Sequence, residues 1–322
     1  MVDVRSEDEF AEGHVRGAFN IPILNNSERV EVGTDYKQKG QAEAIKTGFR
    51  LVGPRFLEII NKAEFIGAGK ELLVHCWRGG MRSANFCSII GMAKLKSYQL
   101  AGGYKSYREK ALESFRTPMH LHVLAGYTGS GKSEILRALR TKGEQVIDLE
   151  HLANHKGSVF GGLMMPPQPT TEQFQNELFE ELSNLDFSRP IWVEDESIAV
   201  GKIFLPQEFY TQMSAAPVFE IQVDKAIRIG RLVKEYGPAE KTEFLRAMES
   251  ITKKLGGQNF KVAKEKLFED DMASTIDILL SYYDKAYSTG LKNKHDRIRS
   301  QISWDGKDPR KCAEALMATT VA

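Results

Sequence analysis

A glycine-rich loop in the middle of the chain limits the possible fold more than any other feature. Residues 126–133 follow the pattern G-x-x-x-x-G-K-S, in which a loop between a strand and a helix binds phosphate. The apolar residues 120–125 predict the strand, and residues 133–140 predict the helix. We therefore expect the second half of the chain to be an α/β domain of the kind that binds nucleotides.

The residue types in this loop suit a phosphate group. Its glycines allow backbone N–H groups to face phosphate oxygens, and Lys132 can reach a terminal phosphate. Ser133 is expected to coordinate Mg²⁺ if a metal ion accompanies a diphosphate. The residues predicted to bind phosphate are Gly126, Gly129, Ser130, Gly131, Lys132 and Ser133. The structural alternative is a glycine-rich turn that binds nothing.

Two groups of acidic residues follow predicted strands of the same domain. Asp148 and Glu150 end the strand after the loop helix, and Glu194, Asp195 and Glu196 end an apolar strand further along. Carboxylates in these positions can reach a bound phosphate or its metal ion, the second group in the place of a Walker B acid. Each of these carboxylates could equally be a charged residue at a strand end that only makes the surface soluble. No residue that would orient an attacking water is identifiable, so nucleotide hydrolysis does not follow.

A second loop, nearer the N-terminus, begins with a cysteine. Cys76 ends an apolar strand and precedes a predicted helix, so backbone N–H groups would point at its sulfur and favour the thiolate. Arg78 and Arg82 add forked donors for an oxyanion. The other residues that we expect to shape this loop are Trp77, Gly79, Gly80 and Ser83. A buried structural cysteine is the alternative, and it is preferred for Cys87 and Cys312.

Composition places the chain among ordinary globular proteins. It has 322 residues, enough for two domains, with 42% hydrophobic and 27% charged residues. The net charge of +1 does not indicate a basic nucleic-acid binder, although a local basic groove remains possible. No apolar run is long enough to span a bilayer, and the N-terminus does not resemble a signal peptide. Three scattered cysteines favour a reducing cytoplasm.

The first part of the chain alternates short apolar segments with helical patterns, which predicts a parallel sheet covered by helices. The predicted strands span residues 2–4, 18–23, 71–76 and 97–100, and the predicted helices span 6–12, 54–62, 82–93 and 104–113. Residues 25–50 are polar and weakly periodic, which predicts a long loop with a helical piece. We place the first domain at residues 1–116, because Pro118 cannot continue the preceding helix.

The second domain, residues 117–322, is expected to continue the α/β pattern and then become helical. Further strands are predicted at residues 145–149, 190–196, 217–223 and 297–304, and residues 225–287 have helical periodicity. The predicted fold class is therefore α/β, with a parallel-sheet domain followed by a P-loop domain that has a helical C-terminal portion.

The thiol loop allows two interpretations, and its flanking sequence separates them. His-Cys-x5-Arg-Ser matches cysteine phosphatases. The segments Asp3-Val4-Arg5-Ser6, Glu9-Phe10, Gly13-His14 and 17–22, however, resemble the opening of rhodanese domains, which carry sulfur as a cysteine persulfide in such a loop. We interpret His14 as a structural residue rather than a catalytic one.

With both loops placed, the whole chain resembles the tRNA 2-selenouridine synthases, in which a rhodanese domain is fused to a P-loop domain. The resemblance rests on residues 76–83, 102–108, 129–133, 148–158, 168–169 and 193–197. Ile198 stands where the family usually has an arginine, whose role Lys202 could take. Residues 2–4 predict a strand already in progress, so we expect an earlier strand to be missing from this sequence.

The resemblance implies a reaction for each loop. The family replaces the 2-thio sulfur of the wobble uridine by selenium from selenophosphate, and also geranylates that sulfur with geranyl diphosphate. Cys76 would take selenium as a selenylsulfide or orient the donor, while Arg78 and Arg82 bind the donor's phosphate. The phosphate loop would hold ATP or the diphosphate of the prenyl donor, with Mg²⁺ as a possible companion. The implied partners are a tRNA that carries 2-thiouridine, selenophosphate and geranyl diphosphate.

The tRNA requires basic and aromatic contacts, which the sequence indicates only weakly. Candidate contacts on one predicted helix are Arg228, Arg231 and Lys234, followed by Lys253, Lys254, Lys261 and Lys264. Charged helical faces are usually just solvated. Trp77, Tyr104 and Tyr107 could stack on a flipped base, or could be core aromatics.

Other functions remain open at this level. A rhodanese-type sulfurtransferase or a cysteine phosphatase, fused to a nucleotide-binding kinase-like domain, would also carry both loops. A phosphatase would need a general acid, and the sequence identifies none. Intact Cys76 and Lys132 argue against a non-catalytic module that only senses nucleotide.

Overall fold

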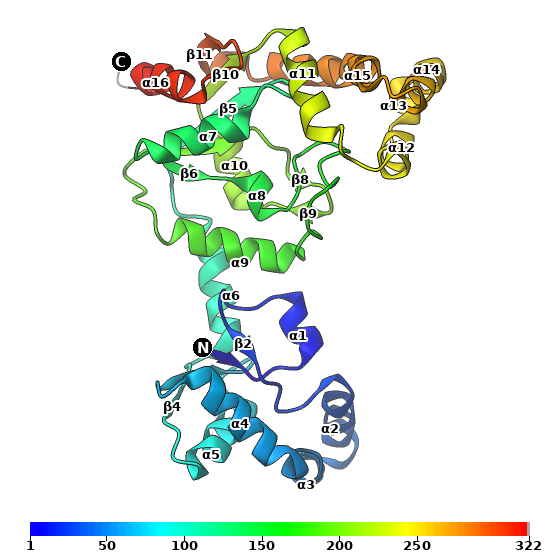
Figure 1. The fold of residues 1–322 in the computed structure, drawn as a ribbon. Coiled ribbons are helices and arrows are strands. Elements are labelled where there is room, and N and C mark those ends of the chain that lie inside the picture. The colour runs from blue at the N-terminus through cyan, green and yellow to red at the C-terminus, as the bar shows by residue number, and fades with distance from the viewer. Residues whose placement is uncertain (321–322) are drawn as a thin grey trace. The chain divides into compact units, whose positions relative to one another are not determined.

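The computed structural model describes residues 1–320 and divides them into two compact units (Figure 1). The first unit comprises Met1–Ser114 and Gln175–Glu180, and the second comprises Phe115–Phe174 and the chain from Glu181 onward. Both units are built on parallel sheets, so the predicted α/β class is confirmed. The return of residues 175–180 to the first unit was not part of the predicted partition. No helix within residues 1–320 is long and apolar enough to cross a membrane.

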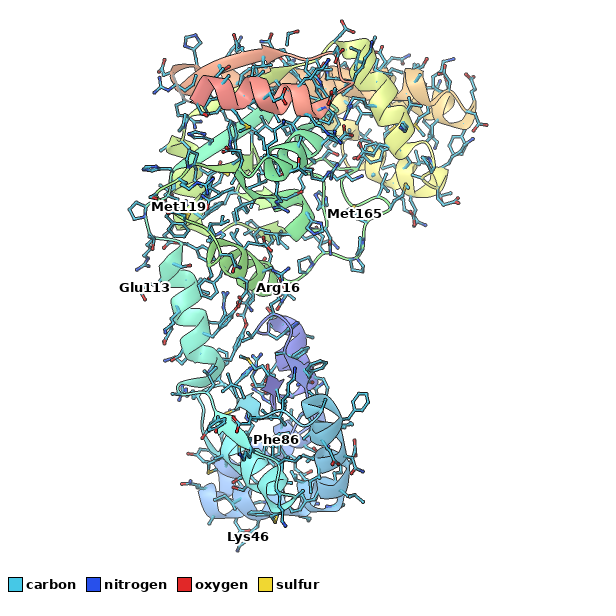
Figure 2. The ribbon with its side chains drawn as sticks, turned by 60° about the vertical axis from the view of Figure 1, so that its left-hand side comes forward. Arg16, Lys46, Phe86, Glu113, Met119 and Met165 are labelled. Atoms are coloured by element: carbon cyan, nitrogen blue, oxygen red, sulfur yellow. The ribbon has the colours of Figure 1, made fainter. Side chains whose placement is uncertain are left out.

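The first unit has a four-stranded parallel sheet in the order β2-β1-β3-β4. Its strands are β1 (Val2–Asp3), β2 (Phe19–Asn20), β3 (Leu72–His75) and β4 (Ser97–Gln99). Its helices are α1 (Glu7–Glu12), α2 (Asn26–Lys39), α3 (Gln41–Val52), α4 (Phe56–Gly67), α5 (Met81–Met92) and α6 (Gly103–Ser114), with a 3₁₀ turn at Gly53–Arg55. Apolar residues of β1, β3, α4 and α5 form the core, and Phe86 of α5 is fully buried in it (Figure 2).

Residues 25–50, predicted as a long loop with a helical piece, form two consecutive helices, α2 and α3, so the loop part of this prediction was wrong. Helix α2 has few apolar residues and therefore lacks the periodicity from which a helix is predicted. It begins with a capping box, in which Asn25 accepts a hydrogen bond from the amide of Glu28 and Glu28 accepts one from the amide of Asn25. The spacing Asn-x-x-Glu is typical of a capping box, and it is the sequence feature from which the start of this helix could have been predicted. Packing against α3 and the Arg55–Glu28 ion pair stabilise the helix.

The second unit has a five-stranded parallel sheet in the order β11-β10-β5-β7-β6. Its strands are β5 (Leu121–Gly126), β6 (Gln145–Ile147), β7 (Ile191–Glu194), β10 (Val218–Gln222) and β11 (Ile298–Ser303), beside a hairpin of β8 (Ala199–Val200) and β9 (Ile203–Phe204). The helices of this part are α7 (Lys132–Thr141), α8 (Leu149–Leu152), α10 (Gln207–Ala215) and α16 (Pro309–Thr320), together with the two ends of α9 (Thr171–Leu182), whose residues Gln175–Glu180 belong to the first unit. Apolar residues of β5, β7, β10, α7 and α16 share one core.

The predicted helical portion is present and forms a separate apolar core within the second unit. It consists of α11 (Lys225–Tyr236), α12 (Lys241–Glu249), α13 (Thr252–Leu255), α14 (Gly257–Phe268) and α15 (Met272–Lys292), followed by a 3₁₀ turn at His295–Arg297. Helices α8, α9, α10 and α16 and the β8–β9 hairpin were not predicted.

The segment after α6, where the domain boundary was predicted, is not an exposed tether. Phe115 is fully buried and Met119 nearly so. The side-chain amide of Gln212, on α10, donates to the carbonyls of Phe115 and Thr117 and accepts from the amide of Met119. These bonds attach the segment to the second unit.

Candidate functional site

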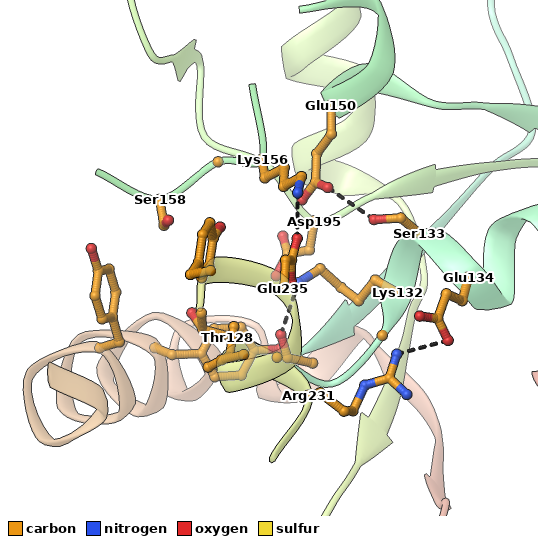
Figure 3. A pocket seen from close by; sticks show the side chains of 18 of the residues that line it. Thr128, Lys132, Ser133, Glu134, Glu150, Lys156, Ser158, Asp195, Arg231 and Glu235 are labelled. Atoms are coloured by element: carbon orange, nitrogen blue, oxygen red, sulfur yellow. Dashed lines mark hydrogen bonds and ion pairs between the residues drawn. The ribbon is translucent and has the colours of Figure 1, made fainter. Parts of the chain in front are cut away.

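The phosphate loop joins β5 to α7 and opens into a cavity of about 1420 Å³ in the second unit (Figure 3). Of the residues predicted to bind phosphate, Gly126, Gly129, Gly131, Lys132 and Ser133 line this cavity. Ser130 does not line it. Its side chain is buried, and its hydroxyl has no partner among residues 1–320.

Glycine is required in this loop for both conformation and space. Gly131 has φ = 78°, a left-handed conformation that other residues rarely adopt. A Cβ atom there would lie 2.5 Å from Nη2 of Arg231 and 2.8 Å from the ring of Trp304. The close approach places Arg231 at the entrance to α7, where its guanidinium pairs with Glu134 at 2.7 Å (Figure 3).

The predicted acids lie at different depths. Glu150 lines the cavity and accepts a hydrogen bond of 2.9 Å from the hydroxyl of Ser133 (Figure 3). Asp148 also lines it, and caps α8 by accepting from the amide of His151. Asp195 lines it and forms an ion pair with Lys294. These three acids therefore lie around the phosphate loop.

Glu194 contradicts the expectation of a phosphate-side acid. It is fully buried at the end of β7, does not line the cavity, and accepts a hydrogen bond of 2.9 Å from the amide of Leu149. Burial, followed by the charges of Asp148 and Glu150, raises the pKa of this carboxyl well above its ordinary value. Its place at the cavity is taken by Glu196, the third acid of the same predicted group. Burial and then the charge of Glu150 raise the pKa of Glu196 to about 8.

The basic residues proposed for tRNA binding differ in their exposure to solvent. Arg228 is only 4% exposed, and its guanidinium binds Asp284 and the carbonyl of Thr128. It therefore stabilises the phosphate loop from the protein interior. The expectation that it contacts tRNA is corrected on this ground. Lys234 and Lys254 are exposed and line the cavity, whereas Lys253, Lys261 and Lys264 are exposed elsewhere.

Several cavity residues were not predicted to belong to the site. Lys156 pairs with Glu235 at 2.5 Å, and both side chains face the cavity (Figure 3). Four tyrosines line another part of the wall, namely Tyr236, Tyr282, Tyr283 and Tyr287. One cavity therefore combines phosphate-binding groups with aromatic and apolar surface. Lys202, suggested as a substitute for the arginine absent at position 198, does not line it.

The thiol loop lies between β3 and α5 in the first unit. Sγ of Cys76 lies 3.3 Å from the amide of Gly80, which donates to it, and 3.2 Å from Oγ of Ser83. Burial raises the pKa of the Cys76 thiol. The hydroxyl of Ser83 and the amides of Ser83, Gly80 and Arg78 outweigh burial and lower the pKa below its ordinary value. The loop therefore favours a thiolate, for the reason predicted from its glycines and helix N-terminus.

Two residues from outside the predicted loop hold it in shape. Gly103 has φ = 60°, and a Cβ atom there would lie 2.4 Å from both the carbonyl oxygen of Cys76 and the amide of Gly79. The side-chain amide of Gln99 donates to the carbonyl of Gly80 at 3.0 Å and to Oγ of Ser83 at 2.6 Å. Gln99 was not predicted, because its role depends on the pairing of β3 with β4.

The two arginines of the loop have different surroundings. Arg82 donates to both carboxylate oxygens of Glu9, at 2.6 Å and 3.2 Å. The guanidinium of Arg78 is exposed and makes no hydrogen bond or ion pair within residues 1–320. Glu9 also pairs with Arg29 at 2.9 Å. Burial raises the pKa of Glu9, but its hydrogen bond with Arg82 and the charge of that residue lower it overall, so the carboxylate is ionised.

The aromatic residues near the thiol loop are mostly structural. Tyr104 is fully buried, with the guanidinium of Arg5 3.7 Å from its ring centre. The hydroxyl of Tyr107 donates to Glu180 at 2.9 Å. Only Trp77 is exposed, at 37%. Nδ1 of His14 lies 2.9 Å from the carbonyl of Phe10, a contact that suits the structural role expected of this histidine.

Comparisons with known proteins agree with one another. The rhodanese-like domain family matches residues 1–110, and the tRNA 2-selenouridine synthase AAA domain family matches residues 119–316. The tRNA 2-selenouridine synthase of Sulfurovum sp. is 35% identical over 92% of this chain and 90% of its own length. The enzymes of the same name from Nitrosomonas europaea and Bdellovibrio bacteriovorus are 32% and 33% identical. They cover 83% and 92% of this chain, and 79% and 89% of their own lengths.

Proposed function

The chain belongs to the tRNA 2-selenouridine synthase family, and on this premise we propose that it replaces the 2-thio sulfur of the wobble uridine by selenium. Its role as an enzyme of tRNA modification follows from the family. The finer proposal is that selenophosphate is the selenium donor. We further propose that the sulfur is first geranylated with geranyl diphosphate.

The lining of the cavity in the second unit supports the proposal of geranylation. A prenyl diphosphate needs a phosphate-binding end and an apolar end, and one cavity offers both. Lys132 and the loop amides suit the diphosphate, while Leu232, Met165 and the tyrosines of α15 suit the hydrocarbon. Ser133 and Glu150 are placed to hold Mg²⁺, which would neutralise charge on the leaving diphosphate. Alkylation turns the sulfur into a thioether, so that it can leave the uridine as a geranyl thiolate.

The thiol loop carries the selenation part. Selenophosphate is a small tetrahedral oxyanion, and the amides around Cys76, with Arg78 at the rim, suit such a group. Selenium in this donor is already at the selenide oxidation level, so it can displace the geranyl thiolate from the base without a redox step. A selenylsulfide on Cys76 would require a two-electron oxidant. We therefore favour a role for Cys76 that leaves the oxidation state of selenium unchanged.

The two half-reactions can be tested separately. The full chain is mixed with tRNA that carries 2-thiouridine, and selenophosphate and geranyl diphosphate are supplied alone and together. Nucleosides are then identified by mass spectrometry. We expect geranylated 2-thiouridine with the diphosphate alone, and 2-selenouridine only when both donors are present.

Variants assign each half-reaction to a unit. Lys132→Ala is expected to stop geranylation, and Cys76→Ser is expected to stop selenation while geranylation continues. Cys87→Ser and Lys142→Ala are matched controls, since both residues lie outside the two loops. Normal selenation by Cys76→Ser, or geranylation that does not depend on Lys132, would refute the assignment.

A further inference from the structure

We propose that the Cys76 loop cleaves the phosphorus–selenium bond of selenophosphate by taking the phosphoryl group onto Sγ of Cys76 and releasing hydroselenide. The inference rests on the proposed function, because selenophosphate is the donor named there. It adds an activity, the hydrolysis of selenophosphate through a phosphocysteine, that can be measured without tRNA.

The step is balanced without any further reactant except water. The thiolate attacks phosphorus, a sulfur–phosphorus bond forms, and the phosphorus–selenium bond breaks with its electron pair on selenium. The selenophosphate dianion carries one proton at neutral pH, and this proton goes with selenium, so the leaving group is hydroselenide, the nucleophile for the uridine. Water then attacks phosphorus, the electron pair returns to sulfur, and inorganic phosphate leaves. Neither selenium nor phosphorus changes its oxidation state.

The geometry around Cys76 is that of a nucleophile rather than a carrier alone. The sulfur lies at the carboxyl end of β3 and before α5, with the amide of Gly80 donating to it at 3.3 Å. Ser83 is held by Gln99, with Oγ 3.2 Å from Sγ, where its proton can stabilise a thiolate before attack and again when the phosphocysteine breaks down. Only 3% of Cys76 is exposed, so the sulfur is reached by a small ligand that enters the loop.

The arginines leave donors available for the transferred group. Arg82 uses two N–H groups on Glu9, of the five that a guanidinium carries. This bidentate pair fixes the orientation of Arg82 and leaves its other N–H groups for phosphoryl oxygens. Arg78 is exposed and unpaired within residues 1–320. Loop amides and two arginines together suit the three oxygens of a phosphoryl group.

The chemistry of the leaving group explains why this loop needs no general acid. A cysteine phosphatase must protonate an alkoxide or phenoxide as it leaves. The carboxylate that contacts this loop is Glu9, and its ion pairs with Arg82 and Arg29 keep it ionised and unable to donate a proton. Hydroselenide is a stable anion at neutral pH and leaves unassisted. The same loop is thus poorly equipped for phosphate esters and well equipped for selenophosphate.

The test uses the full chain with selenophosphate, and separately with inorganic monothiophosphate as the sulfur analogue. Reactions with and without tRNA are quenched, and the Cys76 peptide is analysed by mass spectrometry. We expect one phosphoryl group on Cys76 and release of selenide or sulfide, trapped with a bimane reagent. Ser83→Ala is assayed at alkaline pH, where the thiol ionises in both proteins. It is expected to retain the phosphoryl group about tenfold longer, since one hydrogen bond to a charged group is worth that much.

Controls separate this inference from the proposed function. Cys87→Ser should behave like the unaltered chain, and Cys76→Ser should form no phosphoenzyme and release no selenide. Selenium instead of phosphorus on Cys76 would overturn the inference. So would 2-selenouridine formed with neither phosphocysteine nor Cys76-dependent release of phosphate. A phosphoenzyme in a chain that makes no 2-selenouridine would instead refute the proposed function alone.

Discussion

Arg228 and Asp284 form a bidentate ion pair between α11 and α15, with N–O distances of 2.8 Å and 2.7 Å. The same guanidinium donates to the carbonyl of Thr128 at 3.2 Å, so the pair links the helical portion directly to the phosphate loop. A second ion pair, Lys225–Asp277, joins the same two helices on the surface. The two pairs form a natural comparison between buried and exposed charge.

We predict that Arg228→Met destabilises the second unit by about 3 kcal/mol, because it leaves a partly buried carboxylate without its partner. Lys225→Met should cost less than about 1 kcal/mol, since solvent screens that pair. Urea denaturation of both variants measures the difference. We also expect Arg228→Met to weaken binding of a diphosphate ligand, because the loop loses its support. Equal stability losses for the two variants would contradict the buried arrangement.

Gly103→Ala should disrupt the thiol loop, since a methyl group there meets the backbone of Cys76 and Gly79. We expect a loss of about 2 kcal/mol or more in stability, together with a raised Cys76 pKa as the loop amides shift away from the sulfur. Gly91→Ala in α5 is the matched control, because a Cβ atom there meets nothing and the helix gains stability. Thiolate absorbance against pH and urea denaturation would reveal both effects.

The cavity carboxyl of Glu196 predicts a dependence of stability on pH. Its pKa is about 8 in the folded protein against an ordinary value of 4.5. Between these values the folded chain binds a proton that the unfolded chain has released, so stability falls as pH rises through this window. Glu196→Gln should flatten the dependence of melting temperature on pH, whereas Glu208→Gln, outside the cavity, should not. An unchanged pH profile in Glu196→Gln would show that another group titrates.

Two pairs of lysines separate a specific tRNA site from general electrostatic attraction. Lys234 and Lys254 are exposed and line the cavity, whereas Lys261 and Lys264 are also exposed but lie outside it. Replacing either pair by alanine removes the same charge. We predict that the first double variant weakens tRNA binding by about tenfold at low salt, and the second by less than about twofold. Fluorescence anisotropy with labelled tRNA measures both, and equal losses would point to non-specific binding.

The sequence alone determined those features that depend on residues close together along the chain. The phosphate loop, the strand before it and the helix after it are contiguous, so their residue types and spacing were enough to predict the local structure. The same holds for Cys76 and its amides, which follow from a strand, a glycine turn and a helix start. The α/β class followed from alternating patterns. Helix α2 was missed because its stability comes from its cap and from packing against α3.

Only the tertiary structure decided which side chains face each site. Glu194 and Glu196 are two residues apart at the end of one strand, yet one is buried in the core and the other faces the cavity. Arg228 and Lys234 share a helix, but one is buried behind the phosphate loop and the other is exposed. A sequence pattern shows charge and spacing, whereas burial depends on segments that are distant along the chain, and burial decides whether a charged group binds a ligand or supports the fold.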